Sequence, residues 1–154
     1  MNAQLKKFVE ENYPCPGTAL DLGCGDGIDI NGLRSMGWKC DGVDLKTGTD
    51  LNVPYLSPKH PYDLVYSNFV IHKLTNPKSM SITIEHNLAA SGYFFVQTFH
   101  DTDQYARKSF SPRELIRILE SARLKIIDTA ILAIDEGAPD YHHHIVLQVI
   151  GKKK

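Results

Sequence analysis

The chain has 154 residues, of which 42% are hydrophobic and 23% charged, and its formal net charge is −1. This length predicts one globular domain over residues 1–154 and is too short for two domains with separate cores. The near-neutral charge gives no general footprint for nucleic acid. No apolar stretch reaches membrane-spanning length, and the charged N-terminal segment differs from a secretory signal, so we expect a cytoplasmic protein with no membrane partner. Three scattered cysteines without a CxxC pair indicate neither a disulfide framework nor a zinc site.

Predicted helices and strands alternate along the chain in the order expected of a parallel sheet. The expected helices cover residues 6–13, 28–36, 77–90 and 112–122, and the expected strands cover residues 18–22, 38–45, 62–68, 93–99, 124–134 and 144–150. Ser111 and Glu114 predict a capping box at the last helix. Residues 46–61 hold three prolines and a glycine where a helix and a strand normally stand. The predicted fold is therefore α/β and Rossmann-like: a doubly wound, mostly parallel sheet with an antiparallel final strand, helices on both faces and an abbreviated third unit.

The most informative segment joins the first strand to the next helix. Residues 20–27 read LDLGCGDG, with glycine at three alternate positions. Glycines at the carboxyl end of a first strand let a ligand lie against the main chain, where doubly wound sheets bind nucleotides. The dinucleotide fingerprint fails because Ile28 stands where a third glycine is required. Carboxylates at Asp21, Asp26 and Asp29 would repel a pyrophosphate but suit a ligand with an ammonium and a sulfonium, such as S-adenosylmethionine.

The stretch ALDLGCGDGID resembles the glycine-rich first motif of class I S-adenosylmethionine-dependent methyltransferases, and GVDL, which contains Asp44, is similar to their ribose-binding strand end. The resemblance implies that Asp44 accepts hydrogen bonds from both ribose hydroxyls. It implies that Asp50 and Leu51 hold the adenine, the alternative for Asp50 being an acid in a simple turn. It places the methionine part beside the end of the strand 62–68. The expected cofactor-binding residues are Asp21, Leu22, Gly23, Cys24, Gly25, Gly27, Asp44, Leu45, Asp50, Leu51, Ser67, Asn68 and Phe69.

Candidates for catalysis and substrate binding follow the later strands. Small-molecule methyltransferases of this family often carry a histidine or glutamate near the place of His72, which could orient substrate or act as a base. The alternative for His72 is a histidine at a helix start, bonded to backbone. The expected catalytic residues are His72, His100 and Asp101, and the expected substrate-binding residues are Tyr105, His142 and His144.

The last two histidines raise a second possibility. Side chains alternate along a strand, so His142 and His144 would share one face, as in a two-histidine metal pair. No third ligand is evident in the sequence, so we expect no metal. The acidic loop 135–140 that runs into the final strand resembles small prokaryotic methyltransferases related to the tellurite-resistance group.

These features predict direct, in-line transfer of a methyl group from S-adenosylmethionine to a small-molecule nucleophile. The short chain leaves an open pocket, closed by the first helix or by a second subunit in a homodimer. Asn68, Phe69 and Val70 lack the Asn-Pro-Pro-aromatic pattern of adenine- and glutamine-modifying members, which argues against methylation of a base or amide nitrogen. The rival functions are a non-catalytic cofactor-binding or partner subunit with the same fold, and a protein or tRNA methyltransferase. The intact glycine loop counts against the first rival, and the near-neutral charge counts against tRNA.

Overall fold

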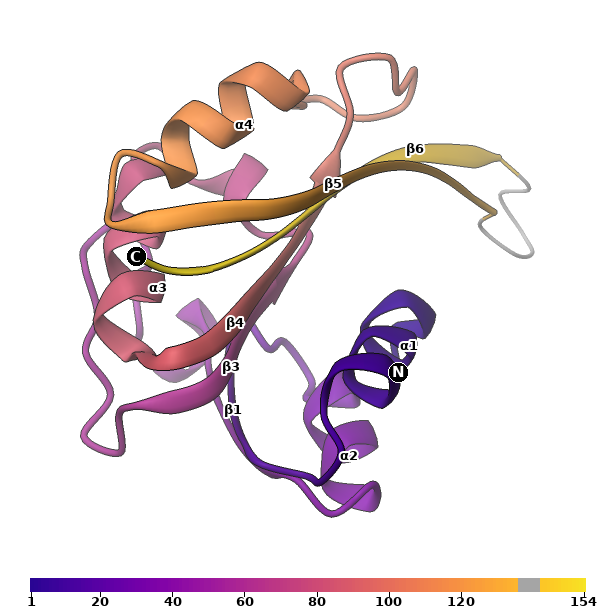
Figure 1. Ribbon diagram of the computed structural model, residues 1–154. Coiled ribbons are helices and arrows are strands. Elements are labelled where there is room, and N and C mark those ends of the chain that lie inside the picture. Colours follow the sequence, from indigo (N-terminus) through magenta and orange to yellow (C-terminus); the bar gives the residue numbers. More distant parts are fainter. Residues whose placement is uncertain (136–141) are drawn as a thin grey trace.

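The computed structural model describes residues 1–135 and 142–154, and Figure 1 gives the names of its elements. The helices are α1 (Ala3–Asn12), α2 (Ile28–Ser35), α3 (Lys78–Asn87) and α4 (Pro112–Leu119). The strands are β1 (Thr18–Leu22), β2 (Lys39–Val43), β3 (Tyr62–Asn68), β4 (Leu88–Phe99), β5 (Leu124–Asp135) and β6 (His143–Lys153). Two 3-10 turns, η1 (Leu45–Thr47) and η2 (Ile71–Lys73), follow β2 and β3. Within the described ranges, no helix has the length and apolar character needed to cross a bilayer.

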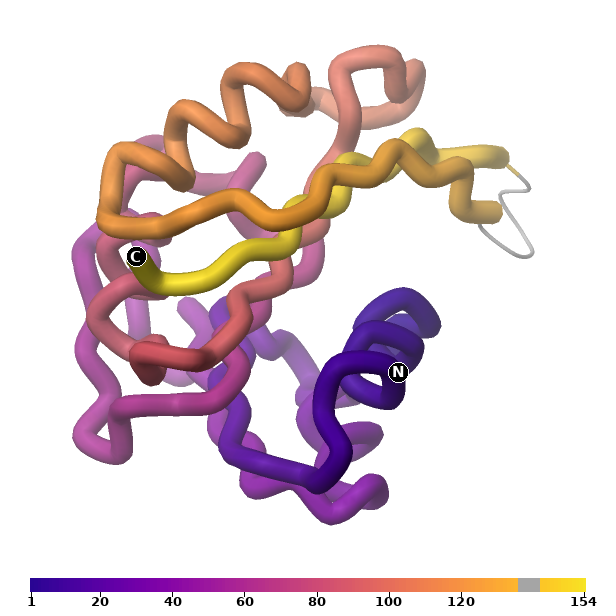
Figure 2. Tube along the Cα trace, in the orientation of Figure 1, coloured from indigo at the N-terminus to yellow at the C-terminus, as the bar shows by residue number. Residues whose placement is uncertain are grey.

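One mixed sheet organises the chain, with strand order β2-β1-β3-β4-β6-β5. β1 pairs in parallel with β2 and β3, and β3 pairs in parallel with β4. β6 runs antiparallel to both of its neighbours. The paired β5 and β6 form a long hairpin that extends beyond the other strands (Figure 2). The expected Rossmann-like fold is confirmed, and the carboxyl ends of β1 to β4 meet at one edge of the sheet, where such folds bind ligands.

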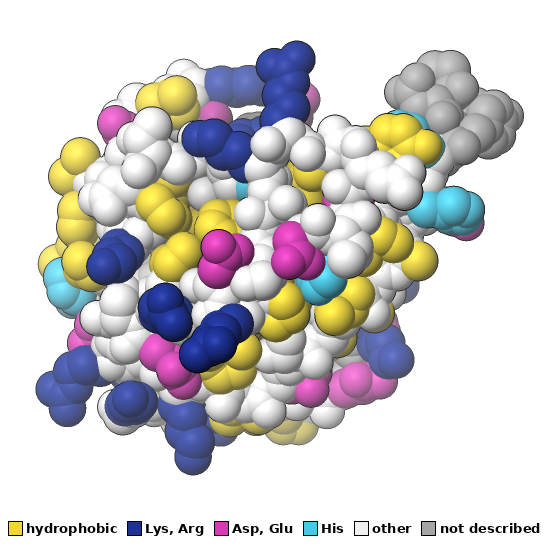
Figure 3. Space-filling model, turned by 90° about the horizontal axis from the view of Figure 1, so that it is seen from above, with side chains coloured by type: hydrophobic (Ala, Val, Ile, Leu, Met, Phe, Trp, Pro, Cys, Tyr) yellow, Lys and Arg dark blue, Asp and Glu magenta, His cyan; other side chains and the backbone are white. Residues whose placement is uncertain are grey.

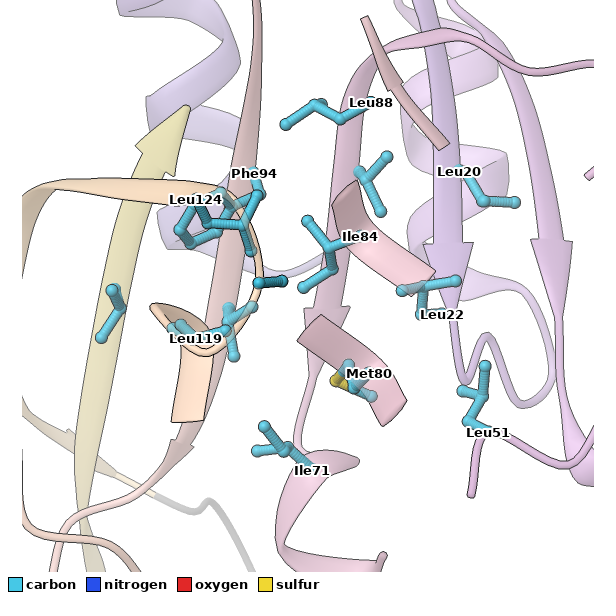
Figure 4. Packing of buried hydrophobic residues seen from close by; sticks show 14 of the residues in the cluster. Leu20, Leu22, Leu51, Ile71, Met80, Ile84, Leu88, Phe94, Leu119 and Leu124 are labelled. Carbon is cyan, nitrogen blue, oxygen red and sulfur yellow. The ribbon is translucent and has the colours of Figure 1, made fainter. Parts of the chain in front are cut away.

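Helices cover both faces of the sheet, with α1 and α2 on one side and α3 and α4 on the other (Figure 1). On the α3 and α4 side, Met80 and Leu119 pack with Leu22 and Phe94, and all four are fully buried (Figure 4). A second cluster on the α1 and α2 side includes Leu5, Phe8, Leu33 and Tyr66. Burial of a side chain of this size is worth about 1.5–3 kcal/mol, so the two clusters hold the layers together.

The predicted helix 77–90 is too long. α3 ends at Asn87, and β4 starts at the next residue, where Leu88 pairs with Tyr62. The buried Asn87 amide donates to the carbonyl oxygens of Tyr55 and Thr83, so it serves tertiary contacts at the helix end. Gly92, which would end the predicted helix, lies inside β4. An added Cβ at this position would lie 2.8 Å from the Asp63 carbonyl oxygen. That glycine permits a close approach of two strands rather than ending a helix.

The other boundaries differ by a few residues. β2 is shorter than the predicted strand 38–45, and α4 is shorter than the predicted helix 112–122. The capping box at α4 is confirmed, because the Ser111 hydroxyl accepts from Glu114 N while the Glu114 side chain accepts from Ser111 N. The expected loop 135–140 lies outside the described residues except for Asp135.

The abbreviated third unit is also confirmed. Between β2 and β3 the structure describes every residue and contains η1 but no strand or α-helix, so β2 remains at the sheet edge. The segment is anchored to α3 instead. Tyr55 N donates to Thr83 Oγ1 at 3.0 Å, and Ser57 N donates to Asn87 Oδ1 at 2.8 Å. These bonds hold residues 46–61 beside the carboxyl edge of the sheet.

Candidate active site

The glycine loop between β1 and α2 is shaped by left-handed backbone. Gly23, Gly25 and Gly27 have φ of 88°, 52° and 80°, a region that side chains disfavour. A Cβ at Gly23 would lie 2.3 Å from Val70 Cγ2, whereas a Cβ at Gly25 or Gly27 would have no neighbour within 4 Å. The first glycine therefore permits tight packing against the segment after β3. The other two leave an exposed main chain against which a ligand can lie.

A cavity of about 500 Å³ opens beside this loop. It is lined by Gly23, Gly25, Asp44, Leu45, Lys46, Thr49, Asp50, Leu51, Asn52, Asn68, Phe69, Val70, Lys73 and Leu74. We call it the cofactor cavity. Most of the cofactor-binding residues expected from the sequence line it. Asp21, Leu22 and Ser67 lie buried in the strands behind the loop, where the Ser67 hydroxyl donates to Leu22 O at 2.8 Å. Cys24 and Gly27 lie in the loop itself without lining the cavity.

Asp44 joins the glycine loop to the end of β2. Its Oδ2 accepts from Gly25 N at 2.9 Å, and its Oδ1 accepts from Lys46 N at 2.9 Å. The backbone N–H of Lys46, followed by that of Gly25, lowers the pKa of this carboxyl below its usual value. Asp44 is therefore ionised at neutral pH. Each carboxylate oxygen has a second lone pair with which it can accept from a ligand hydroxyl.

Asp50 and Leu51 lie together at the cavity wall. Asp50 Oδ1 accepts from the backbone and side-chain nitrogens of Asn52 at 2.9 and 3.0 Å, so this oxygen holds a turn. Leu51 is only 4% exposed and belongs to the core cluster on the α3 side. Both residues line the cofactor cavity, and adenine binding by this pair stays a prediction.

Asn68 carries an unsatisfied buried acceptor. Its Nδ2 donates to Asp29 Oδ2 at 2.9 Å, while Asp29 Oδ1 accepts from Asn2 N at 2.7 Å. A carboxylate only accepts, so the amide nitrogen of Asn68 must face Asp29 and its Oδ1 must face away. That Oδ1 is buried and has no hydrogen-bond partner in the described structure. An unmade bond of this kind costs about 1–3 kcal/mol, so the atom fits a donor on a bound ligand.

Asp21 lies behind the glycine loop and is 4% exposed. Burial raises its pKa to about 7, against a hydrogen bond from Tyr66 that lowers it, and the charges of Asp29 and Asp44 raise it further. This carboxyl therefore titrates near neutral pH. A positive group in the cofactor cavity would favour its ionised form.

Phe69 separates the cofactor cavity from a second cavity. It has φ of 60°, which is strained for a bulky side chain and costs on the order of 1–3 kcal/mol. Its N–H donates to Gln97 O at 2.9 Å, which holds the strained residue in place. Phe69 lines both the cofactor cavity and the second cavity, whose volume is about 470 Å³. The second cavity is lined by Asn2, Ala3, Gln4, Phe69, Phe99, Ala133, Ile134, Asp135, His144 and Val146.

Phe99 and His144 of the second cavity belong to a group of rings from three parts of the chain. The Phe99 ring centroid lies 5.2 Å from that of Phe69, 4.9 Å from that of His72 and 4.8 Å from that of His144. The Tyr105 ring lies 4.1 Å from that of His142. The structure therefore brings His72, Tyr105, His142 and His144 together around Phe99; their roles in catalysis and substrate binding stay predictions.

Asp103 holds the histidine pair in place. Its buried Oδ2 accepts from His144 Nδ1 at 2.9 Å and from Ile145 N at 2.6 Å. Since His144 Nδ1 carries the proton of that bond, its Nε2 is an acceptor, and it faces His142 Nε2 at 3.0 Å. Burial opposes ionisation of Asp103, but these hydrogen bonds, with those from Tyr105 and Ala106, lower its pKa below the usual value. The negative charge can stabilise a proton taken up by the two imidazoles.

Sequence reasoning missed Asp103 and named its neighbours instead. The signal was an acid placed to accept from the backbone two and three residues on: Asp103 Oδ1 accepts from Tyr105 N and Ala106 N, each at 2.8 Å. His100 is buried, contacts Asp101 at 3.1 Å and accepts from Thr102 N at 3.2 Å. Neither His100 nor Asp101 lines the cavities at this edge of the sheet. Their predicted catalytic role is therefore not supported by proximity to the other candidates.

His72 is neutral over a wide pH range. Burial, followed by the charges of Lys73 and Lys108, lowers its pKa to about 4. Its Nδ1 lies 3.2 Å from Thr98 Oγ1.

Among the described residues, no group of three or more His, Cys, Asp or Glu side chains is arranged to hold a metal ion.

Comparison with known proteins identifies the family. The profile of the family described as "Methyltransferase domain" matches residues 1–128. The chain belongs to this methyltransferase family. It is an S-adenosylmethionine-dependent methyltransferase. The cofactor cavity agrees with this assignment, because it combines an open glycine loop, an ionised acid for ribose hydroxyls and a buried acceptor that lacks a donor. No curated protein sequence matches the chain.

Many solved structures share the methyltransferase fold. A Burkholderia thailandensis 1,6-didemethyltoxoflavin-N1-methyltransferase, with bound 1,6-didemethyltoxoflavin and S-adenosylhomocysteine, has a TM-score of 0.76 and 18% identity over 99% of this chain and 77% of its own. A TehB-like methyltransferase from Corynebacterium glutamicum has a TM-score of 0.72 and 18% identity over 96% of this chain and 86% of its own. A Haloferax volcanii putative methyltransferase, in complex with the Trm112 activator, has a TM-score of 0.74 and 16% identity, with 96% and 88% coverage. At these identities the likeness shows the fold alone, and the tellurite-resistance grouping stays a prediction.

Proposed function

We propose that this methyltransferase acts on a small molecule that enters the second cavity and presents a nucleophilic atom to the cofactor cavity across Phe69. The observation that carries the proposal is that Phe69 lines both cavities, so ligands in the two spaces would meet at this residue. Aligning a nucleophile with a reactive group can supply much of a reaction's rate. The second cavity, at about 470 Å³, has the size of a small-molecule site.

The residues that would hold the cofactor follow from their chemistry. S-adenosylmethionine, when bound, supplies a methyl group that its sulfonium already activates. Asp44 would accept from the ribose hydroxyls, while Asp50 and Leu51 would hold the adenine. The unsatisfied Asn68 Oδ1 would accept from the ammonium of the methionine part. Asp21, behind the loop, would add negative charge on the same side.

A proton acceptor is available for nucleophiles that arrive protonated. The Nε2 atoms of His142 and His144 lie 3.0 Å apart, and Asp103 holds the His144 ring by accepting from its Nδ1. We propose that this pair accepts the proton of a phenol or thiol as the methyl group is transferred, with the hydrogen bond between the two Nε2 atoms opening so that one imidazole nitrogen receives the proton. His72 lies against Phe99 and is proposed as a substrate contact. His100 and Asp101 support the loop that carries Asp103.

Calorimetry with S-adenosylhomocysteine tests the cofactor site directly. Binding should raise the free energy of unfolding by about 2.7 kcal/mol at a hundredfold excess over the dissociation constant, and NAD should have no effect. Formation of S-adenosylhomocysteine from S-adenosylmethionine should then be followed with a panel of phenols, thiols and carboxylic acids. Binding of NAD without binding of S-adenosylhomocysteine would contradict the proposal.

The second candidate function is that of a subunit that is active only together with a partner protein. A fold relative is described in complex with the Trm112 activator, which favours testing this case. Turnover by the isolated chain distinguishes the two. An isolated chain that binds S-adenosylhomocysteine but transfers no methyl group to any member of the panel would favour the partner subunit. A peptide or tRNA acceptor would be revealed by methylation in the same assay with those substrates.

A further inference from the structure

A third cavity, of about 410 Å³, lies between η2 and the loop that follows β4. It is lined by His72, Lys73, Phe99, Tyr105, Ala106, Arg107, Lys108 and His144. We call it the basic cavity. Phe99 and His144 line both the basic cavity and the second cavity, so the two spaces adjoin at these residues. A molecule bound in the basic cavity would therefore lie next to the histidine pair.

The basic cavity has a local excess of positive charge. Lys73, Arg107 and Lys108 line it, and no carboxylate does. None of these cations takes part in an ion pair within residues 1–135 and 142–154. On the face seen in Figure 3, Lys and Arg side chains lie among Asp and Glu side chains. The chain as a whole carries a net charge of −1, so the excess is a local property.

The two acids of the loop after β4 are bonded elsewhere, and the acid whose charge interacts with that of Lys73, Asp44, lines the cofactor cavity. Asp103 accepts with both oxygens from His144, Ile145, Tyr105 and Ala106. Asp101 contacts the buried His100 instead. An anion that enters the cavity therefore meets positive charge without a competing carboxylate on the lining.

The loop that presents two of the cations is held at its base. Phe110 N donates to Phe99 O at 2.9 Å, and Asp101 N donates to Phe110 O at 3.0 Å. Asp103 fixes the middle of the loop through the backbone of Tyr105 and Ala106. The two basic residues that follow are therefore displayed from an anchored backbone. A preorganised site loses less conformational entropy when it binds a ligand.

The other lining groups are flat. The Phe99 ring contacts the rings of His72 and His144, at centroid distances of 4.9 and 4.8 Å. Tyr105, which is 58% exposed, also lines the cavity, and its ring centroid lies 6.0 Å from that of His144. Such rings favour stacked or edge contacts with an aromatic ligand. The arginine can hold a carboxylate through paired hydrogen bonds.

We propose that the basic cavity binds an aromatic carboxylate, with its ring against Phe99 and Tyr105 and its carboxylate toward Lys73, Arg107 and Lys108. The inference rests on the proposed function, since the bound acid is the methyl acceptor. The ring would then reach toward the His142–His144 pair, which takes the proton of a phenol or thiol on the same molecule in the step proposed above. The chain thus selects acceptors by an anionic group that is separate from the reacting atom.

Matched acid and amide probes test this assignment. Salicylate and salicylamide, and naphthoate and naphthamide, differ in charge but little in shape. Calorimetry with the full chain saturated with S-adenosylhomocysteine should show each acid binding about tenfold more tightly than its amide, the effect of one hydrogen bond to a charged group. Added salt should weaken binding of the acids and leave the amides unchanged.

A double variant locates the site. Arg107→Gln with Lys108→Gln should remove most of the preference for the acid while leaving the affinity for S-adenosylhomocysteine unchanged, because neither residue lines the cofactor cavity. Arg113→Gln with Arg117→Gln, on α4, is the matched control and should change neither affinity. Equal binding of acid and amide, or a preference that survives the double variant, would overturn the proposal. If the unmodified chain does not bind S-adenosylhomocysteine, that result would overturn the proposed function instead.

Discussion

The two halves of the active site are built in different ways. The cofactor half is formed by the glycine loop, by Asp44 directly after β2, and by Asp50 in the segment that follows η1. The substrate half joins η2, the loop after β4 and the start of β6, with partners such as Asp103 and His144 that lie 41 residues apart. The first half depends mainly on the backbone of the glycine loop and its bond to Asp44, with one longer link from Asn68 to Asp29. The second depends on hydrogen bonds between distant segments, so it should be the easier half to disrupt without harming the other.

The largest effect is expected from Asp103→Ala. The substitution leaves the His144 ring and the N–H groups of Ile145, Tyr105 and Ala106 without their acceptor. Because these donors are then left without an acceptor, the free energy of unfolding should fall by about 3 kcal/mol. Chemical denaturation measures the loss, and turnover should fall further because His144 is no longer oriented.

Asp101→Ala provides the control for that experiment. Its carboxylate is half exposed, so stability should change by less than about 0.5 kcal/mol. Both variants should bind S-adenosylhomocysteine as the unmodified chain does, provided that each is folded at the assay temperature. A loss of cofactor affinity in Asp103→Ala would show that the two halves are coupled, contrary to the comparison.

The reverse experiment is Asp44→Ala. It removes the proposed acceptor for the ribose hydroxyls and should cost about 1.5–3 kcal/mol of affinity for S-adenosylhomocysteine, measured by calorimetry. Asp26→Ala is the control, because its side chain is 83% exposed and its ion pair with Lys46 contributes little. Binding of the aromatic acids should survive in Asp44→Ala. Unchanged cofactor affinity in that variant would remove Asp44 from the site.

Asp21 predicts a pH dependence of stability. Its folded pKa, near 7, lies above the unfolded value of 3.8, so the folded state binds more protons between these values. Stability contributed by this group is therefore full below about pH 4 and lost as the pH rises toward 7, by up to about 1.4 kcal/mol per pH unit. Relative to the unmodified chain, Asp21→Asn should become progressively more stable over this interval in denaturation measured at several pH values. A difference that stays constant with pH would show that Asp21 does not titrate there.

His72 predicts a pH dependence of stability with the opposite sign and over a narrower pH range than Asp21. Its folded pKa, about 4, lies below the ordinary value of 6.5, so the unfolded state binds more protons between these two values. The stability it contributes is present above pH 6.5 and is lost as the pH falls toward 4. His72→Gln should flatten that part of the stability curve. We also expect the dependence of the methylation rate on pH, measured above pH 5, to be the same in this variant as in the unmodified chain. A shift of that pH dependence in His72→Gln would show that His72 is the titrating base.

The sequence sufficed for features that local chemistry decides. Three alternate glycines predict the open backbone at Gly25 and Gly27, since only glycine adopts left-handed φ without penalty. The place of Asp44 directly after the second strand predicts that it lies beside the glycine loop, because a parallel strand brings its next residue to the carboxyl edge of the sheet. The capping box and the missing third unit are equally local. In each case a short run of residues contains both the group and the reason for its position.

Only the tertiary structure decided the rest. The sequence offers two acids, Asp101 and Asp103, and which of them becomes the buried partner of His144 depends on how the loop turns and where β6 begins. The end of α3 likewise depends on contacts of Asn87 with the distant segment at Tyr55 and on the pairing of Leu88 with Tyr62. The basic cavity exists because an anchored loop lies opposite η2. Such contacts join residues far apart in the chain, and their free energies are available only once the sheet has brought those residues together.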